Sequence, residues 1–430
     1  MLSFISIVLV LRFLPVSEGQ QCKNDFGKTV DWYPKSNEFL CLTVIRVVCF
    51  HAENYIFRFY LYKLPQIENN SNSNMAKGYA YIYITSLNAS GDWELSKRSI
   101  RDPSSALSQT LAPIYGTSSD DIMHIFYSSE PPSEQAHLRK GESKGVVITN
   151  QKQGLWLIHS TPKFPLPPVS KKEIDTAFGK LNSFNRPNKY TYPSSASKHG
   201  QMYFCVSLPS SQLSKIGHVF KYVKPRIYSS YVPQSLEKFL LNLATKTGKY
   251  VRKTTRYQKT ALKSWGGENF ISYAKSKHFR KDIYVDYMAA DLRTDLGVEA
   301  NNRGLSPIPP NCSKQYQVYD VKELDIKLSN QSIRFKTTED YSKWIVTTEA
   351  NSSTVCIGDV SRNVYQYKYG GGALCHRNVN VWKRFMKIIS KVQGCSAESR
   401  NQNGKPTTKP TKSSKKKTTE KKRTTNNKPA

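Results

Sequence analysis

The chain has 430 residues, of which 38% are hydrophobic, so it can bury a sizeable core and is not a wholly disordered protein. It carries 64 Lys and Arg against 32 Asp and Glu, a formal net charge of +32. Such a charge favours polyanionic partners, for example nucleic acid, heparin-like glycans or anionic membrane surfaces.

The first 19 residues predict a secretory signal peptide. An apolar run over 4–11 is followed by small residues at Ser17 and Gly19, a pattern that suits cleavage. No other stretch approaches the roughly 18 uninterrupted apolar residues of a membrane span, so we expect a soluble, secreted protein, with lysosomal delivery as the alternative. The eight cysteines then lie in an oxidising compartment and predict disulfides, whose pairing the spacing leaves open.

Further features agree with passage through the secretory pathway. Five N-x-S/T sequons predict a glycoprotein, and they begin at Asn69, Asn88, Asn311, Asn330 and Asn351. Residues 396–430 are dominated by Lys, Thr, Pro, Ser and Asn without apolar periodicity, which predicts a disordered basic tail. The body, 20–395, keeps a net charge of +23 without that tail. The polyanion preference therefore belongs to the folded part as well.

Within the body, strand patterns alternate with helical ones. Strands are expected over 79–84, 145–148, 155–158, 202–208 and 344–346, and the second and third of these make a plausible hairpin around Gln153 and Gly154. Apolar residues at helical spacing predict helices over 236–247 and 381–392, and Pro-rich stretches at 162–168 and 307–310 predict loops. This alternation indicates an α/β or α+β architecture.

Common enzyme motifs are absent. The chain contains no G-x-x-x-x-G-K-[ST] or H-E-x-x-H motif and no paired C-x-x-C sets. A single histidine such as His159, taken without context, is more typical of a structural residue than of a catalyst.

A series of sequence blocks supplies that context. In chain order these blocks are Val30-Asp31-Trp32-Tyr33, Leu61-Tyr62-Lys63-Leu64-Pro65, Lys144-Gly145-Val146-Val147-Ile148, the segment 155–165 that contains His159, Gly200-Gln201, Ser272-Tyr273-Ala274-Lys275-Ser276, Asp340-Tyr341-Ser342-Lys343-Trp344, Cys356-Ile357-Gly358-Asp359 and Gly370-Gly371-Gly372-Ala373-Leu374-Cys375. Together they resemble the deoxyribonuclease II family, over roughly 21–395 and in the family's order.

The resemblance implies a phospholipase D-like α/β fold with two halves, each a β-sheet flanked by helices, around one shared site. Each half of an active member contributes an H-x-K motif. One imidazole attacks the DNA phosphodiester, the other protonates the leaving oxygen, and the two lysines hold the phosphate oxygens. The chemistry uses no metal or other cofactor, and it suits acidic compartments, where one histidine can be neutral while the other is protonated.

Here the two motifs depart from the family. They read Glu142-Ser143-Lys144 and Tyr341-Ser342-Lys343, so both histidines are replaced while both lysines remain. An ionised Glu142 would repel a phosphodiester, whereas Tyr341 could attack one only after strong activation, for which Lys343 is the nearest help. His159 matches a family histidine and becomes a candidate site residue.

The resemblance also implies three disulfides, Cys22 with Cys205, Cys312 with Cys395, and Cys356 with Cys375. Cys41 and Cys49 are left over, and both lie in 34–58, a stretch that separates blocks nearly contiguous in the family. Two interpretations stay open for this stretch: an inserted hairpin with its own disulfide, or translated non-coding sequence.

Three functions compete. The first is a secreted, catalytically impaired deoxyribonuclease II homologue that binds DNA or another polyanion. The alternative is an active, metal-independent acid endodeoxyribonuclease that uses Tyr341 or His159. The third is an interaction protein for a glycan or a protein, with the nuclease fold as scaffold. The sequence leaves the oligomeric state open.

Overall fold

The structure is a computed structural model that describes residues 20–27, 58–85, 91–115, 122–132, 141–150, 152–168, 189–234, 256–300 and 306–395. The chain divides into a compact unit that ends at Cys395 and a second unit, Ser396–Ala430. The predicted signal peptide, residues 34–57 of the predicted insertion, the predicted helix over 236–247 and the predicted tail all lie outside the described residues.

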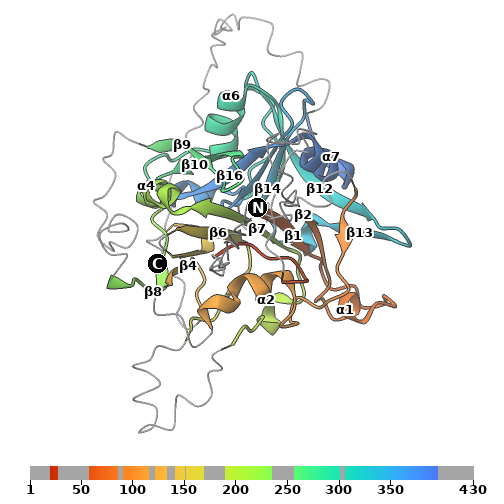
Figure 1. Ribbon diagram of the computed structural model, residues 1–430. Coiled ribbons are helices and arrows are strands. Elements are labelled where there is room, and N and C mark those ends of the chain that lie inside the picture. Colours follow the sequence, from red (N-terminus) through yellow and green to blue (C-terminus); the bar gives the residue numbers. More distant parts are fainter. Residues whose placement is uncertain are drawn as a thin grey trace, which may run out of the picture. The chain divides into compact units, whose positions relative to one another are not determined.

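The first sheet has eight strands among the described residues, in the order β3-β2-β1-β7-β6-β5-β4-β8 (Figure 1). The strands are β1 (Arg58–Lys63), β2 (Tyr81–Thr85), β3 (Glu94–Leu95), β4 (Met123–Ser128), β5 (Lys144–Thr149), β6 (Gln153–His159), β7 (Gln201–Pro209) and β8 (Ile227–Tyr231). Strands β5 and β6 pair antiparallel, which confirms the predicted hairpin.

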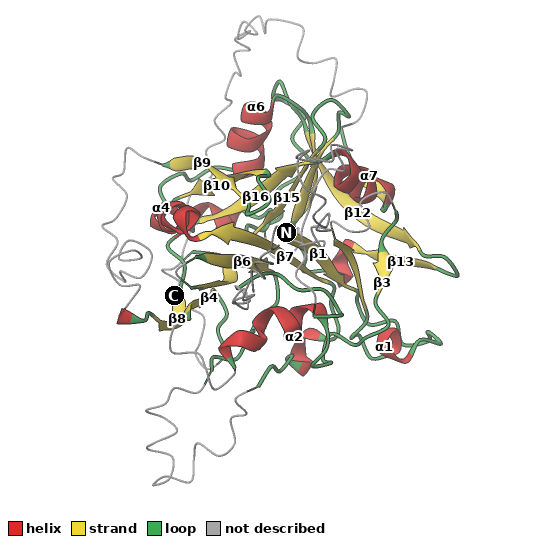
Figure 2. Ribbon diagram, viewed as in Figure 1, coloured by secondary structure: helices red, strands yellow, loops and turns green. Residues whose placement is uncertain are grey.

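The second sheet has nine described strands, of which eight follow the order β13-β12-β11-β14-β15-β16-β10-β9, while β17 pairs with β12. The strands are β9 (Tyr257–Lys263), β10 (Asn269–Lys275), β11 (Leu296–Glu299), β12 (Val318–Lys327), β13 (Ser332–Lys336), β14 (Trp344–Thr347), β15 (Thr354–Gly358), β16 (Gly371–Arg377) and β17 (Ile389–Gln393). Figure 2 shows that strands dominate the described part and that the helices are short and few.

The two sheets repeat one arrangement. The central path β1-β7-β6-β5-β4 of the first sheet matches the path β10-β16-β15-β14-β11 of the second, strand for strand in chain order. Each path is also followed by a helix after its last strand, α4 (Leu213–Val223) after β7 and α7 (Val379–Lys387) after β16. The sequence analysis predicted two α/β halves, and this pseudo-symmetric pair of sheets confirms that prediction.

The remaining helices are shorter. They are α1 (Ser73–Ala76), α2 (Ala106–Leu111) and α6 (Ala289–Leu292), which continues a π-helical turn over Tyr284–Met288. Short 3-10 helices lie at Ala112–Ile114, Ser194–Ala196, Ser210–Gln212, Thr337–Glu339 and Val364–Lys368. No described helix is both long enough and apolar enough to cross a membrane.

Alternation along the strands divides the core into layers. In β1, Tyr60 and Tyr62 belong to a central apolar cluster that contains residues of both sheets, whereas Phe59 and Leu61 belong to a second cluster that includes α2. A third cluster lies beneath the π-helical turn and α6. Because successive side chains of a strand point to opposite faces, a strand buried on both faces reads as the continuous apolar run seen here.

The prediction for 381–392 is partly wrong. Helix α7 ends at Lys387, and Ile389–Gln393 forms β17 instead. Strand β17 pairs antiparallel with β12, so the open edge of a neighbouring strand overrides the helical spacing of Ile389 and Val392.

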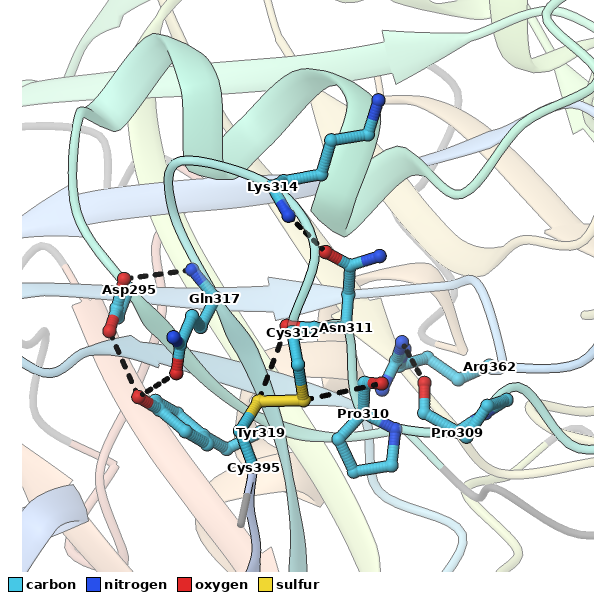
Figure 3. Close-up of a disulfide and its surroundings, with 10 residues drawn as sticks. All are labelled: Asp295, Pro309, Pro310, Asn311, Cys312, Lys314, Gln317, Tyr319, Arg362 and Cys395. Atoms are coloured by element: carbon cyan, nitrogen blue, oxygen red, sulfur yellow. Dashed lines mark hydrogen bonds between the residues drawn. A yellow bond between two sulfur atoms is a disulfide. The ribbon is translucent and has the colours of Figure 1, made fainter. Parts of the chain in front are cut away.

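Three disulfides join the pairs that the family resemblance implied. They are Cys22–Cys205, Cys312–Cys395 and Cys356–Cys375. Figure 3 shows that the second of these ties the last residue of the compact unit to the loop before β12. Cys41 and Cys49 lie outside the described residues.

Candidate functional site

A recess between the two sheets brings together the ends of four strands. Its lining residues are Ser143, Lys144, His159, Ser160, Lys343, Gly358 and Asp359. Lys144 begins β5 and His159 ends β6, while Lys343 directly precedes β14 and Asp359 directly follows β15. Since β5 and β6 correspond to β14 and β15 in the repeated arrangement, each half delivers one lysine to the same place.

The backbone repeats this symmetry. The N–H of Glu142 donates to the carbonyl of Gly370, 2.8 Å away, and the N–H of Tyr341 donates to the carbonyl of Gly200, 2.9 Å away. Each motif is therefore held by the opposite half. A side chain on Gly370 would collide with the backbone of Val223, so only glycine allows this approach.

Two buried lysines fix the loops that carry these glycines. Lys63, at the end of β1, donates to the carbonyls of Ser197 and His199, and Lys275, at the end of β10, donates to those of Gln366 and Tyr369. Burial lowers the pKa of Lys63 to about 7 and that of Lys275 to about 8. Both lysines stand in the sequence blocks quoted above, yet their positioning role is visible only in three dimensions.

The two motif lysines differ in their surroundings. Lys144 Nζ lies 2.8 Å from Glu130 Oε1 and 3.0 Å from Ser129 Oγ, whereas Lys343 Nζ lies 3.3 Å from the carbonyl oxygen of Tyr341. Burial, with help from the positive charge of Lys144, lowers the pKa of Lys343. Burial alone would lower the pKa of Lys144 too, but the carboxylates of Glu130 and Glu142 outweigh it and raise that pKa. The two lysines therefore share the recess with nearby carboxylates, and Lys144 is the one that a carboxylate pairs directly.

His159 is confined beside Lys144. The side chain is 2% exposed, its ring stacks on Tyr203 at 5.8 Å, and the edge of Phe164 packs at 5.4 Å. Neither ring nitrogen makes a hydrogen bond of normal geometry to another described residue. Burial, then the charge of Lys144, lowers the His159 pKa to about 3, so the imidazole stays neutral at any pH where the protein would work. A neutral imidazole can accept a proton but cannot donate one as an imidazolium.

The replaced positions lie beside the lysines. Glu142 is half-buried, and the ring of Tyr341 stacks on that of His199 with 4.1 Å between the centroids. The ammonium of Lys343 approaches the carbonyl oxygen of Tyr341. Of the five candidate residues, Lys144, Lys343 and His159 line the recess, whereas Glu142 and Tyr341 do not and lie two residues before its lysines.

Two acidic residues were missed. Asp359 lies in the recess, and burial raises the pKa of its carboxyl to about 7 although Lys343 and Lys144 oppose that change. The block Cys356-Ile357-Gly358-Asp359 could have pointed to it. Glu130 lies 12 residues before Glu142 with no motif spacing, so nothing in the sequence could have found it. The described residues contain no group of three or more His, Cys, Asp or Glu side chains that could hold a metal ion.

Comparison with known proteins decides the family. The model of the family "Deoxyribonuclease II" matches residues 52–395. The chain belongs to the deoxyribonuclease II family. It is 30% identical to Deoxyribonuclease-2-alpha of Rattus norvegicus over 396 residues, 91% of this chain and 99% of the relative. It is 28% identical to Plancitoxin-1 of Acanthaster planci over 403 residues, 92% of this chain and 98% of the relative.

A nematode relative belongs to the same group. Cell-death-related nuclease 7 of Caenorhabditis elegans is 28% identical over 384 residues, 88% of this chain and 89% of the relative. Deoxyribonuclease II membership agrees with the mixed α/β fold of two large sheets, and it indicates a nuclease-type function with DNA as the substrate class. At the two positions where the family resemblance leads us to expect the motif histidines, this chain has Glu142 and Tyr341.

Proposed function

We propose that the protein binds DNA, or another polyanion, through Lys144 and Lys343 and is impaired in the two-histidine cleavage of its family. One observation carries the proposal. Glu142 and Tyr341 occupy equivalent backbone positions, each held by a glycine carbonyl of the opposite half and each two residues before a retained lysine. The two lysines that would hold phosphate are present, and the residues at the expected positions of the nucleophile and the acid are not imidazoles.

The electrostatics support binding. Lys343 is 8% exposed, and both lysines keep their ammonium groups at the recess, where low solvent access strengthens their attraction for phosphate oxygens. The body around them carries a net charge of +23. Polyanion binding of this kind should weaken steeply as salt rises, whereas a mostly apolar protein contact should not.

Glu142 and Tyr341 are poor substitutes for the nucleophilic and the proton-donating imidazole. The Glu142 carboxylate contributes negative charge next to Lys144 and Lys343, which opposes an incoming phosphodiester. The ring of Tyr341 stacks on that of His199. Lys343 contacts the carbonyl oxygen of Tyr341, and a contact at the carbonyl does not activate the phenol.

A second candidate function rests on His159. A neutral imidazole that lines the recess beside Lys144 has the protonation state of a base or a nucleophile. The second candidate is therefore a residual acid endonuclease that works through His159, and the variant His159→Ala tests it.

The decisive experiment is nicking of supercoiled plasmid at pH 5 with chelator present. We expect the parent to leave the plasmid intact and the double variant Glu142→His/Tyr341→His to nick it, because the scaffold and the lysines then regain both imidazoles. A triple variant that adds Lys343→Gln is the matched control and should be silent again. Nicking by the parent that persists in parallel preparations and disappears in His159→Ala would overturn the impaired-enzyme proposal.

We also propose export from the cell. The three disulfides suit an extracellular or lysosomal compartment. Asn69, Asn330 and Asn351 are exposed, so three of the five sequons can accept a glycan without disturbing the core. Mass spectrometry of the protein collected from culture medium, before and after enzymatic removal of N-glycans, tests both points.

A further inference from the structure

Glu130 forms an ion pair with Lys144, one of the two motif lysines. The residue lies two positions after β4, and its side chain is 54% exposed, whereas that of its partner Lys144 is 8% exposed. Glu130 Oε1 lies 2.8 Å from Lys144 Nζ. The ammonium group of a buried motif lysine is therefore paired with the carboxylate of a solvent-exposed side chain.

More than one lysine acts on this carboxylate. Lys144 first, and Lys343 and Lys163 more weakly, lower the pKa of Glu130 against the opposing effect of burial. A phosphodiester oxygen at this position would meet the same attraction to Lys144 as the Glu130 carboxylate does. The lowered pKa favours the ionised form of Glu130 beside Lys144.

The backbone fixes Glu130 where it stands. Its N–H donates to Ser128 Oγ at 3.0 Å, and its carbonyl accepts from the N–H of Lys163 at 2.8 Å. Lys144 also donates to Ser129 Oγ at 3.0 Å. The turn after β4 thus fixes the backbone from which Glu130 reaches Lys144.

We propose that Glu130 is an internal competitor for phosphate: its carboxylate occupies Lys144, and a phosphodiester gains that lysine only by displacing it. Glu130 then sets the affinity of the site and weakens it for every phosphate ligand. This inference rests on the proposed function, since it assumes that Lys144 and Lys343 are the phosphate ligands.

The test is the isosteric variant Glu130→Gln, which removes the charge and keeps the shape. The probe is a fluorescein-labelled dodecathymidylate, titrated with the full chain and followed by fluorescence anisotropy at low salt. We expect affinity to increase about tenfold, because one negative charge next to the bound phosphate disappears. Glu68→Gln, which neutralises an exposed carboxylate away from the recess, is the matched control and should leave affinity unchanged.

A double variant tests whether the affinity gained by Glu130→Gln depends on Lys144. In a Lys144→Gln background, Glu130→Gln should change affinity by less than twofold, because the lysine for which the two anions compete is absent. If Glu130→Gln does not tighten binding while Lys144→Gln and Lys343→Gln both weaken it, the internal-competitor inference is wrong and the proposed function stands. If neither lysine variant weakens binding, the proposed function itself fails. A gain that persists in the Lys144→Gln background also overturns the inference.

Discussion

The pKa values of two carboxyl groups near the motif lysines are shifted in opposite directions. Burial raises the pKa of Asp359 to about 7, while Lys144 holds the pKa of Glu130 below its ordinary range. As pH falls through 7, Asp359 takes up a proton and loses its negative charge, whereas Glu130 remains ionised. The recess therefore becomes more positive on acidification, and the residue responsible for that change is Asp359.

The first prediction follows from this charge change. The affinity for the labelled oligonucleotide should rise about three- to tenfold between pH 8 and pH 6, because deprotonated Asp359 repels phosphate and protonated Asp359 does not. In Asp359→Asn, affinity should be high and nearly constant over that interval. Anisotropy titrations of both proteins at fixed ionic strength measure the difference. An equally steep pH dependence in Asp359→Asn would show that another group is responsible.

At the scale of elements, helix α7 joins the two sheets. Asn378 caps its first turn by accepting hydrogen bonds from the N–H groups of Asn380 and Val381. The ring of Phe385, fully buried, packs against Trp344 of the second sheet and against Trp93 and Tyr60 of the first sheet side, with centroids 5.2 to 5.8 Å apart. One helical face therefore contributes to the core that holds both halves around the site.

Phe385→Ala should lower the free energy of unfolding by about 3–5 kcal/mol, since it removes a buried ring and leaves a cavity among three aromatic neighbours. Urea denaturation followed by tryptophan fluorescence measures the change. The control is Lys383→Ala, an exposed position of the same helix, which should cost less than about 0.5 kcal/mol. A loss below about 1 kcal/mol for Phe385→Ala would show that α7 does not hold the halves together.

At the scale of the whole molecule, a buried polar group crosses between the sheets. Arg58 of β1 forms an ion pair with Glu268, and its guanidinium also lies 2.7 Å from His376 Nε2 of β16. Tyr60 Oη lies 3.2 Å from the other ring nitrogen. Burial lowers the pKa of Arg58 while Glu268 opposes that change, and burial lowers the pKa of His376 to about 4. The positive charge of the buried Arg58 is therefore balanced by the carboxylate of Glu268.

Replacing Glu268 alone should lower the free energy of unfolding more than replacing Arg58 and Glu268 together. Glu268→Leu should destabilise the protein by about 3–5 kcal/mol, because Arg58 stays buried without its counter-charge, whereas Arg58→Met/Glu268→Leu should lose less. The measurement is a double-mutant cycle by urea denaturation. Additive losses would contradict the idea that the pair acts as one unit.

Stability should also respond to pH through His376. Its unfolded imidazole binds a proton below about 6.5, whereas the folded one does so only below about 4, so protons favour the unfolded state in that interval. The contribution of His376 to stability is therefore present above about 6.5 and is lost as pH falls toward 4. His159 acts in the same direction, with a folded pKa of about 3.

Sequence patterns located much of this fold for local reasons. The apolar runs at 145–148 and 155–158 and the turn between them required β5 and β6 to pair, because their side chains and turn residues specify a hairpin by themselves. The helix over 381–392 was too long, because the pairing of Ile389–Gln393 with β12 depends on a strand about 60 residues away. Local spacing contains no information about such a partner.

The sequence by itself determined the family and, through that resemblance, the three described disulfides. It also predicted that both motif histidines are replaced while Lys144 and Lys343 are retained. Only the tertiary structure decided that Lys144, Lys343 and Asp359 line one recess and that Glu130 forms an ion pair with Lys144. The reason is physical: motif identity is a property of neighbours along the chain, whereas burial, pKa and competition for a lysine depend on which charges the folded chain brings within a few ångströms.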